Sequence, residues 1–439
     1  MSACPRFAFW LLVAALLLTG CTPGAPAAVT TPAAEQLETP APPDPPAPTQ
    51  EEVSFPVNAQ QIAAANAMGF DLLRGVSALA EADQNLFLSP PSVALALAMV
   101  LNGAAGETRA AILEAMHLPG WEDAAVNEAM AGLRQALTGG DLGVELAIAN
   151  SLWGRVGIPF RAEFLATGQR YYAARIETLD FDDPAASETI NAWVKAQTRE
   201  RIPEIVPKQI DPETILFLIN AIYFKGDWEL PFRPQATRDQ PFTRADGSRV
   251  QVPMMSQEDT FVYGESDEWQ IVRLPYKGER LSMVVVLPSQ GRTVDELAAS
   301  LDADAWAEMQ SEMVYLEGYL ALPRFSYSFG ASLNEPLKEM GMEIAFEEGS
   351  ADFSRLHEAP WPTWISDVRH KTFVEVNERG TEAAAVTSIE VQAESMPLER
   401  FTFVADRPFL FAIQDNASGS ILFIGVLRDP LQTEAQAAG

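Results

Sequence analysis

Histidine is the residue type that most often carries acid–base chemistry in proteins, and the chain has three: His117, His357 and His370. A catalytic histidine needs a nucleophile, a carboxylate or a metal held beside it. The sequence of 439 residues contains no GxSxG elbow, no HExxH helix, no glycine-rich phosphate loop and no Cys/His pair. His370 begins a strand-like run, where a hydrogen-bonded structural histidine is expected. The residue types therefore predict a protein that is not an enzyme and that needs no metal or cofactor.

A different kind of chemistry is suggested by residues 375–395, which read EVNERGTEAAAVTSIEVQAES. Taken as a strand, the segment has one small or apolar face and one mostly polar face. The first face carries Thr381, Ala383, Ala385, Thr387, Ile389 and Val391, and the second carries Glu382, Ala384, Val386, Ser388, Glu390 and Gln392. Such a strand could slide into a sheet above a packed core, with Gly380 as its hinge. The alternative is a solvated loop without function, although structureless loops of this length are uncommon in compact domains.

The elements that must position this segment follow from hydrophobic periodicity. Helical spacing predicts helices over Ala59–Leu79, Pro91–Leu101, Thr108–Met116, Ala124–Leu137 and Pro184–Arg201. Strands are predicted over Leu146–Trp153, Ile215–Phe224, Leu281–Leu287, Leu316–Phe325, Lys371–Val376 and Ile421–Leu427. Because helices precede strands without regular βαβ alternation, the fold class is predicted to be α+β.

The N-terminus has the features of an export signal. Arg6 precedes the apolar run Phe7–Leu18, which is too short to span a bilayer, and Leu18–Cys21 (LTGC) resembles a bacterial lipobox. In that case residues 1–20 are a lipoprotein signal peptide and Cys21 carries lipid; an ordinary secretory signal with an incidental cysteine is the alternative. Either way the protein is expected to be exported, and we expect a lipoprotein of the cell envelope or cell surface.

Two further segments flank the predicted globular domain, which covers residues 53–430. Residues 21–52 are rich in Pro and Ala and should form an extended spacer of about 3.1 Å per residue, roughly 100 Å in all. Residues 431–439 form a C-terminal tail. The only other cysteine, Cys4, lies in the signal, so the mature domain has no disulfide. The formal net charge of −30 argues against a nucleic-acid partner, because phosphate would be repelled.

Several motifs, taken together with EVNERGTEAAAVT, resemble the serpin family in type and order over essentially all of residues 53–430. They are NLFLSPPS at Asn85–Ser92, NAIYFKGDW at Asn220–Trp228, LPRF at Leu322–Phe325, ADFS at Ala351–Ser354 and ADRPFLF at Ala405–Phe411. The resemblance implies a serpin-like α+β fold with large mixed or antiparallel sheets, about eight or nine helices and an exposed reactive-centre loop.

The resemblance also implies a function, inhibition of a serine protease by suicide-substrate trapping. The protease would attack the loop and form a covalent acyl-enzyme, and the freed loop would insert into the main sheet and distort the protease before deacylation. A non-inhibitory serpin-fold protein, for binding or storage on the cell surface, is the alternative. Small residues in the hinge favour inhibition.

The same resemblance assigns roles to individual residues. The hinge would comprise Gly380, Thr381, Glu382, Ala383, Ala384 and Ala385. The polar cluster over which the sheet opens, called the shutter, would comprise Ser89, Ser92, Asn220 and His370, and Trp228 would lie where the loop enters, the breach. Hydroxyl, amide and imidazole groups can exchange hydrogen-bond partners as strands separate, which an apolar core could not.

The usual serpin spacing from Thr381 places the reactive bond between Glu394 and Ser395. A glutamate there would require a protease with a basic primary pocket. A shift of one residue would instead present Ala393, which suits enzymes with small pockets, such as elastase-like or subtilisin-like proteases. Ala124–Leu137 offers only Arg134 as a base, which argues against activation by heparin. We expect a monomer. The sequence leaves open which protease is the target, whether cysteine proteases are inhibited and which membrane carries the anchor.

Overall fold

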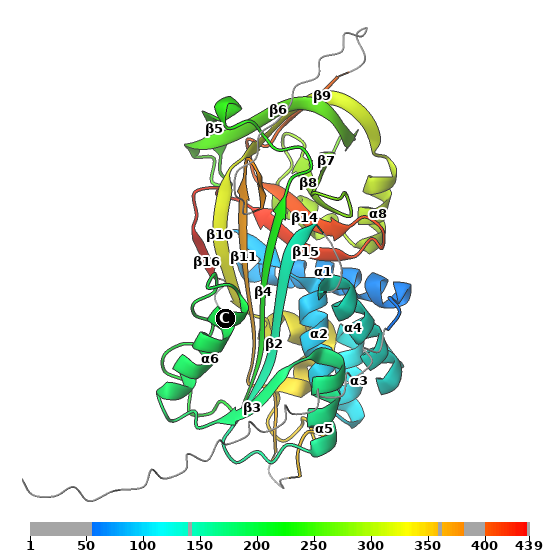
Figure 1. The fold of residues 1–439 in the computed structure, drawn as a ribbon, viewed down its shortest axis with the longest axis vertical. Helices are drawn as coiled ribbons and strands as arrows, with labels where there is room; N and C mark the ends of the chain where they lie inside the picture. The colour runs from blue at the N-terminus through cyan, green and yellow to red at the C-terminus, as the bar shows by residue number, and fades with distance from the viewer. Residues whose placement is uncertain (1–54, 139–142, 359–361, 382–399, 437–439) are drawn as a thin grey trace, which may run out of the picture. The chain divides into compact units, whose positions relative to one another are not determined.

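Helices α1–α4 pack on one side of a long sheet in the computed structural model (Figure 1). The structure describes residues 55–138, 143–358, 362–381 and 400–436, which all belong to one compact unit that begins at Val53. The α-helices of these residues are α1 (Ala59–Leu79), α2 (Pro90–Leu101), α3 (Gly106–Ala115), α4 (Asp123–Thr138), α5 (Ala162–Thr167), α6 (Ala185–Gln197), α7 (Val294–Ser300), α8 (Ala303–Ser311) and α9 (Asn334–Leu337).

The strands form two sheets. The seven-stranded sheet has the order β16 (Glu434–Gln436), β10 (Phe325–Ser332), β11 (Asp367–Asn377), β12 (Gly380–Thr381), β4 (Leu216–Asp227), β2 (Val144–Arg155) and β3 (Arg175–Leu179). The nine-stranded sheet has the order β1 (Leu86–Leu88), β15 (Ile421–Leu427), β14 (Phe409–Asp415), β8 (Leu281–Pro288), β7 (Trp269–Pro275), β6 (Arg249–Glu265), β9 (Val314–Pro323) and β13 (Phe401–Val404), with β5 (Arg238–Thr243) paired to β6.

The seven-stranded sheet is covered on both faces, and β4 shows how. Its Leu218 and Ile222 point into the larger hydrophobic core, which includes α1 and α2. Its Phe217 and Ile219 point the other way, into a smaller core beneath α6. This alternation is what the period of two along a strand requires. In Figure 1, α6 and helices α1–α4 accordingly lie on opposite sides of the sheet.

The structure confirms the α+β class and the serpin-like architecture, with nine α-helices in the described residues. Several predicted boundaries were wrong. The strand predicted over Lys371–Val376 begins at Asp367, so His370 lies within β11 and not at its start. The helix predicted to reach Arg201 ends at Gln197, because Arg199 and Glu200 adopt positive φ angles of 52° and 64°. The single strand predicted over Leu316–Phe325 is two strands, β9 and β10, which divide at Arg324.

The described residues contain no helix long and apolar enough to cross a membrane. The same residues contain no group of three or more His, Cys, Asp or Glu side chains that could hold a metal ion.

Candidate functional site

The most unusual feature of the seven-stranded sheet is the seam between its central strands. Strands β11 and β4 run parallel and pair directly over Asp367–Phe373 and Phe217–Tyr223. Beyond Phe373 the two strands are separated by β12, which pairs antiparallel with β11 at Val376 and Asn377. It also pairs antiparallel with β4 at Gly226 and Asp227. A third strand therefore begins between two neighbours that are otherwise joined.

The two residues of β12 fit this narrow entrance closely. Gly380 has a φ of 154°, and a side chain there would collide with the backbone of Gly226. Thr381 is completely buried, which agrees with the inward face that the sequence alternation assigned to it. Its Oγ1 lies 2.9 Å from the hydroxyl oxygen of Tyr276. Only glycine can occupy position 380 without displacing β4.

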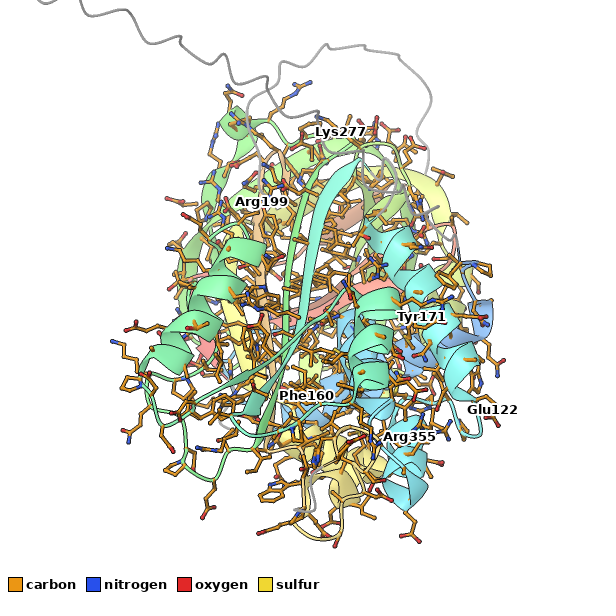
Figure 2. The ribbon with its side chains drawn as sticks, turned by 60° about the horizontal axis from the view of Figure 1, so that its bottom comes forward. Glu122, Phe160, Tyr171, Arg199, Lys277 and Arg355 are labelled. Atoms are coloured by element: carbon orange, nitrogen blue, oxygen red, sulfur yellow. The ribbon has the colours of Figure 1, made fainter. Side chains whose placement is uncertain are left out.

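Two aromatic side chains pack beside Thr381 at the entrance of the seam. Trp228, immediately after β4, stacks on Tyr276 with ring centroids 4.7 Å apart and an interplanar angle of 14°. Burial raises the pKa of the Tyr276 phenol, so the hydroxyl stays neutral and keeps its hydrogen bond with Thr381. Lys277 follows in sequence, and its ammonium group pairs with Asp227 Oδ2 at 2.8 Å at this end of the sheet (Figure 2).

The turn that leads into β12 is held by the backbone and side chain of the same tryptophan. Trp228 Nε1 donates to the carbonyl oxygen of Asn377 at 3.0 Å, and the Trp228 N–H donates to that of Arg379 at 2.7 Å. The carboxylate of Glu378 accepts hydrogen bonds from Arg324 and from the Thr237 hydroxyl. Burial raises the pKa of Glu378, but these hydrogen bonds outweigh burial and the net pKa is lowered.

Further along the seam, polar side chains from three strands meet the start of α2. Asn150, Asn220 and His370 lie side by side on β2, β4 and β11. His370 Nδ1 lies 2.5 Å from Asn220 Oδ1, and Asn220 Nδ2 donates to Asn150 Oδ1 at 2.5 Å and to the hydroxyl and carbonyl oxygens of Ser92. His370 Nε2 accepts the backbone N–H of Ser89 at 3.2 Å. One hydrogen bond of this network, His370 to Asn220, crosses the seam itself.

The geometry of His370 excludes it as a catalytic base. Its Nε2 lone pair already accepts a hydrogen bond, and its side chain is only 1% exposed. Burial lowers the pKa of His370 from 6.5 to about 3, so the imidazole is neutral with its proton on Nδ1. The other two histidines contact different partners: His117 Nε2 lies 2.6 Å from Asp71 Oδ2, and His357 Nε2 lies 2.5 Å from the Thr363 hydroxyl.

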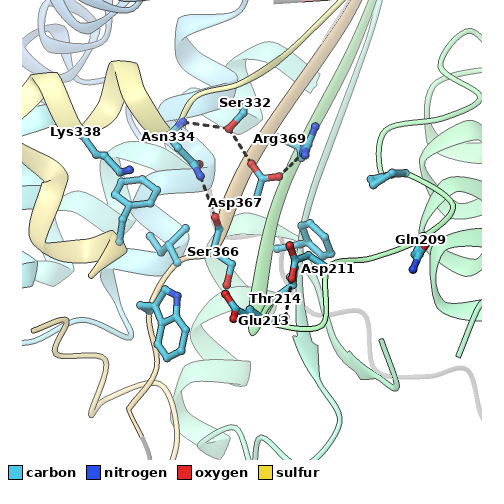
Figure 3. Close-up of a pocket in the computed structure, with 15 residues that line it drawn as sticks. Gln209, Asp211, Glu213, Thr214, Ser332, Asn334, Lys338, Ser366, Asp367 and Arg369 are labelled. Carbon is cyan, nitrogen blue, oxygen red and sulfur yellow. Dashed lines mark hydrogen bonds and ion pairs between the residues drawn. The ribbon is translucent and has the colours of Figure 1, made fainter. Parts of the chain in front are cut away.

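The far end of the seam opens into a cavity of about 440 Å³ (Figure 3). Phe217 of β4 and Asp367 and Arg369 of β11 line it where the two strands begin. Asp367 accepts hydrogen bonds from Ser332 and Arg369, which fixes the position of the first residues of β11. The seam thus runs from a partly filled entrance at Thr381 to an open space at its other end.

The structure brings together most of the site residues that it describes. Ser89, Ser92, Asn220 and His370 form one hydrogen-bonded cluster, and Trp228 lies at the entrance with Gly380 and Thr381. The remaining predicted positions, Cys21, Glu382, Ala383, Ala384, Ala385, Glu394 and Ser395, lie outside the described residues.

Sequence reasoning missed two residues of the site. Asn150 carried a usable signal, because it interrupts the apolar face that Ile148 and Leu152 form on β2. Tyr276 carried none, since it follows β7 in a short turn and reaches the entrance only through the tertiary fold. The hydroxyl of Ser89 makes no hydrogen bond within the described residues, and its contribution to the cluster is the backbone N–H.

Comparison with known proteins identifies the family of the chain. The family model described as serpin (serine protease inhibitor) matches residues 63–430. The chain belongs to the serpin family. The human leukocyte elastase inhibitor is 38% identical to this serpin over 359 residues, which cover 79% of this chain and 93% of that protein.

Two solved structures superpose on this serpin over most of its length. The thermophilic serpin tengpin in its native state matches with a TM-score of 0.79 and 31% identity, over 86% of this chain and 96% of that one. Human thyroxine-binding globulin, solved in complex with its ligand, matches with a TM-score of 0.78 and 27% identity, over 85% and 99% of the two chains. The proteins similar to this chain thus include both an elastase inhibitor and a globulin named for its ligand.

Proposed function

We propose that this serpin inhibits a serine protease by trapping it as a covalent acyl-enzyme, with insertion of the cut loop into the β4–β11 seam as the driving step. The observation that carries the proposal is the position of Gly380 and Thr381, which already lie between β4 and β11 in the uncut chain. Cleavage beyond Thr381 would free the following residues to continue in the same direction along the seam. The residues after Thr381 begin with Glu and three alanines, which are small enough to follow.

Insertion would replace one parallel ladder with two antiparallel ones. Because β12 is antiparallel to both neighbours, a strand that continues it would pair on both sides, and antiparallel pairing is somewhat more stable per residue than parallel pairing. A gain of on the order of ten hydrogen bonds at about 0.5–1.5 kcal/mol each is comparable to the ~5–15 kcal/mol that stabilises a protease domain. The released energy is therefore sufficient to distort the tethered enzyme. The cavity at the far end of the seam offers space for the last residues of the inserted strand.

The position of the cut decides which protease is the target. Cleavage between Glu394 and Ser395 would indicate a protease with a basic primary pocket. The likeness to an inhibitor named for leukocyte elastase favours the alternative in which Ala393 precedes the cut bond. The shutter role of the His370 cluster belongs to the same proposal, since insertion along the seam has to break the His370–Asn220 hydrogen bond.

The proposal is tested by incubating the protein with a panel of serine proteases that includes glutamate-specific and elastase-like enzymes. A complex that survives denaturing gel electrophoresis, with loss of protease activity, is the expected result. Mass spectrometry of the released C-terminal peptide then shows whether it begins at Ser395 or at Glu394. Cleavage by every enzyme, with full activity retained and no complex, would contradict inhibition. That result would favour the second candidate, a binding protein, which the likeness to thyroxine-binding globulin supports.

Attachment to a membrane through Cys21 is part of the proposed function. Lipid on Cys21 and the Pro/Ala-rich spacer up to Glu52 would hold the inhibitor at the surface of the cell, away from the membrane. The full chain is expected to partition into detergent, and a Cys21→Ser variant is expected to remain in the aqueous phase. Intact-mass analysis provides the second measurement. An unmodified wild-type cysteine would contradict the lipid anchor without affecting the inhibition proposal.

A further inference from the structure

The two edges of the seven-stranded sheet differ in how they are protected. An exposed edge strand presents unpaired backbone groups to any other strand, and proteins usually block it with charge, proline or short length. The edge strand β3 is five residues long and carries an ion pair between Arg175 and Glu177 at 2.8 Å. At the other side β10 reads FSYSFGAS, with eight residues, no charge and no proline. The composition of β10 therefore contains none of the features that usually prevent an edge strand from pairing with another strand.

The structure covers that edge with the C-terminal segment of the chain. Strand β16 runs parallel to β10, with Ser328 opposite Glu434 and Gly330 opposite Gln436. Just before it, the backbone N–H of Ser328 donates to the carbonyl oxygen of Thr433 at 3.1 Å. The serpin family match ends at residue 430, so the covering segment lies outside the matched part of the chain.

The direction of this segment is fixed by a polar network at its base. Asp429 pairs with Arg244 at 2.8 Å, and its backbone N–H donates to Asn85 Oδ1 at 2.9 Å. The backbone N–H of Asn85 donates in turn to Gln432 Oε1 at 2.8 Å. Both the Asp429 and Arg244 side chains are mostly buried, at 13% and 26% exposure. These contacts orient the chain toward β10 at the point where the family match ends.

We propose that residues 431–436 protect the edge of β10 against self-association. Without this segment, β10 of a second copy of this chain would pair with the edge of β10. The partner follows from the geometry of the edge. Two β10 strands related by a two-fold axis are antiparallel, and each presents the same small outward residues, Ser326, Ser328 and Gly330, to the other. The covering strand β16 is itself only three residues long, which makes it a poor template for a further strand.

The proposal is tested by comparing the full chain with a variant that ends at Pro430. Both are incubated at the same concentration and analysed by size-exclusion chromatography with light scattering. The truncated chain is expected to show a dimer association constant about tenfold higher, equivalent to about 1.4 kcal/mol of association free energy. A full-length Ala435→Pro variant, which removes a backbone donor from β16, should shift in the same direction while keeping every residue up to Pro430.

A rescue variant distinguishes edge pairing from general instability. Ser326→Lys in the truncated chain places a lysine on the bare edge, opposite Glu375 in the register, and should restore the monomer. Hydrogen exchange should show the Ser328 amide protected in the full chain and in the truncated dimer, but not in the truncated monomer. The proposal is overturned if the truncated chain and Ala435→Pro stay as monomeric as the full chain, or if Ser326→Lys fails to reduce association.

Discussion

At the scale of single residues, Thr381 connects the sequence pattern to the mechanism. Alternation along the segment placed its side chain inward, and the structure shows it fully buried with its hydroxyl against Tyr276. The next residue, Glu382, lies outside the described residues, and the same alternation assigns it to the outer face. The pair therefore offers two adjacent positions at which the same substitution should have opposite consequences.

Thr381→Arg should convert the inhibitor into a substrate. A buried guanidinium without a partner costs several kcal/mol, and each 1.36 kcal/mol added to the insertion barrier slows insertion about tenfold. Slow insertion lets the acyl-enzyme hydrolyse first, so the variant should be cut without forming a gel-stable complex. Glu382→Arg is the matched control and should inhibit nearly as wild type. Equal inhibition by both variants and the wild type would contradict the alternation argument.

His370 should make the stability of the sheet depend on pH. Burial lowers its pKa in the folded state from 6.5 to about 3, so between these values only the unfolded chain binds the proton. The contribution of His370 to the free energy of unfolding is fully present above pH 6.5. It falls as the pH decreases, by up to about 1.4 kcal/mol per pH unit. Denaturant midpoints between pH 6.5 and pH 5 measure the slope. A His370→Gln variant should flatten it, and an unchanged slope would assign the pH dependence to other groups.

At the scale of elements, the hinge strand β12 depends on a residue from a distant part of the chain. Tyr276 follows β7, yet its hydroxyl holds Thr381 and its ring supports Trp228. Because the hydrogen bond keeps the first inserted residue in the position that full insertion also requires, it should favour the inserted arrangement before and after cleavage. Tyr276 would therefore act as a positioning residue for insertion, through Thr381 and not through the protease.

Tyr276→Phe removes this hydrogen bond and keeps the stacked ring. A net loss of about 0.5–1.5 kcal/mol is expected from one hydrogen bond, so the stoichiometry of inhibition should rise while the rate of loop cleavage stays unchanged. Hydrogen exchange of the Thr381 amide measures the hinge directly and should be faster in the variant. Tyr263→Phe, which removes a hydroxyl hydrogen-bonded to Glu265 and Gln270, is the control. A variant with wild-type stoichiometry and exchange would show that ring stacking alone holds the hinge.

Elements could be predicted from the sequence where one physical signal dominated, and the others were missed. The 3.6-residue period fixed α1 at Ala59–Leu79, and the apolar run of β15 fixed Ile421–Leu427. Strand β6 was missed because its polar centre and Pro253 hide the period of two. The site residues also fall into those that the sequence predicted and those that only the structure revealed. Motif resemblance located the polar cluster and Trp228, but Tyr276 and the cover over β10 arise from tertiary contacts that no local pattern records.

At the scale of the whole molecule, the seam of the seven-stranded sheet combines two kinds of strand pairing in the described residues. Strands β4 and β11 pair directly over Asp367–Phe373 as a parallel ladder, which is less stable per residue than an antiparallel one. At the entrance of the seam, β12 already pairs antiparallel with both strands. A cavity lies open at the far end. A chain with such an arrangement should be a kinetic trap, because a more stable pairing exists but is separated from it by the barrier to opening the seam.

Cleavage of the loop should therefore raise the thermal midpoint of the protein. In the proposed mechanism, a cut at Glu394–Ser395 or Ala393–Glu394 frees the residues after Thr381 to insert, and the inserted strand adds hydrogen bonds on both sides. A gain of ~5–15 kcal/mol from about ten hydrogen bonds would raise the midpoint by roughly 5–20 °C, since an unfolding entropy of about 2.1 cal/mol/K per residue makes 1 kcal/mol worth about 1 °C in a domain of this size. Differential scanning calorimetry of cut and uncut protein measures the difference. Cleavage of the Thr381→Arg variant should raise the thermal midpoint much less, because the first inserted residue of that variant carries a charge. If cut and uncut wild-type protein unfold at the same temperature, no energy is stored in the seam, and the trapping mechanism loses its driving force.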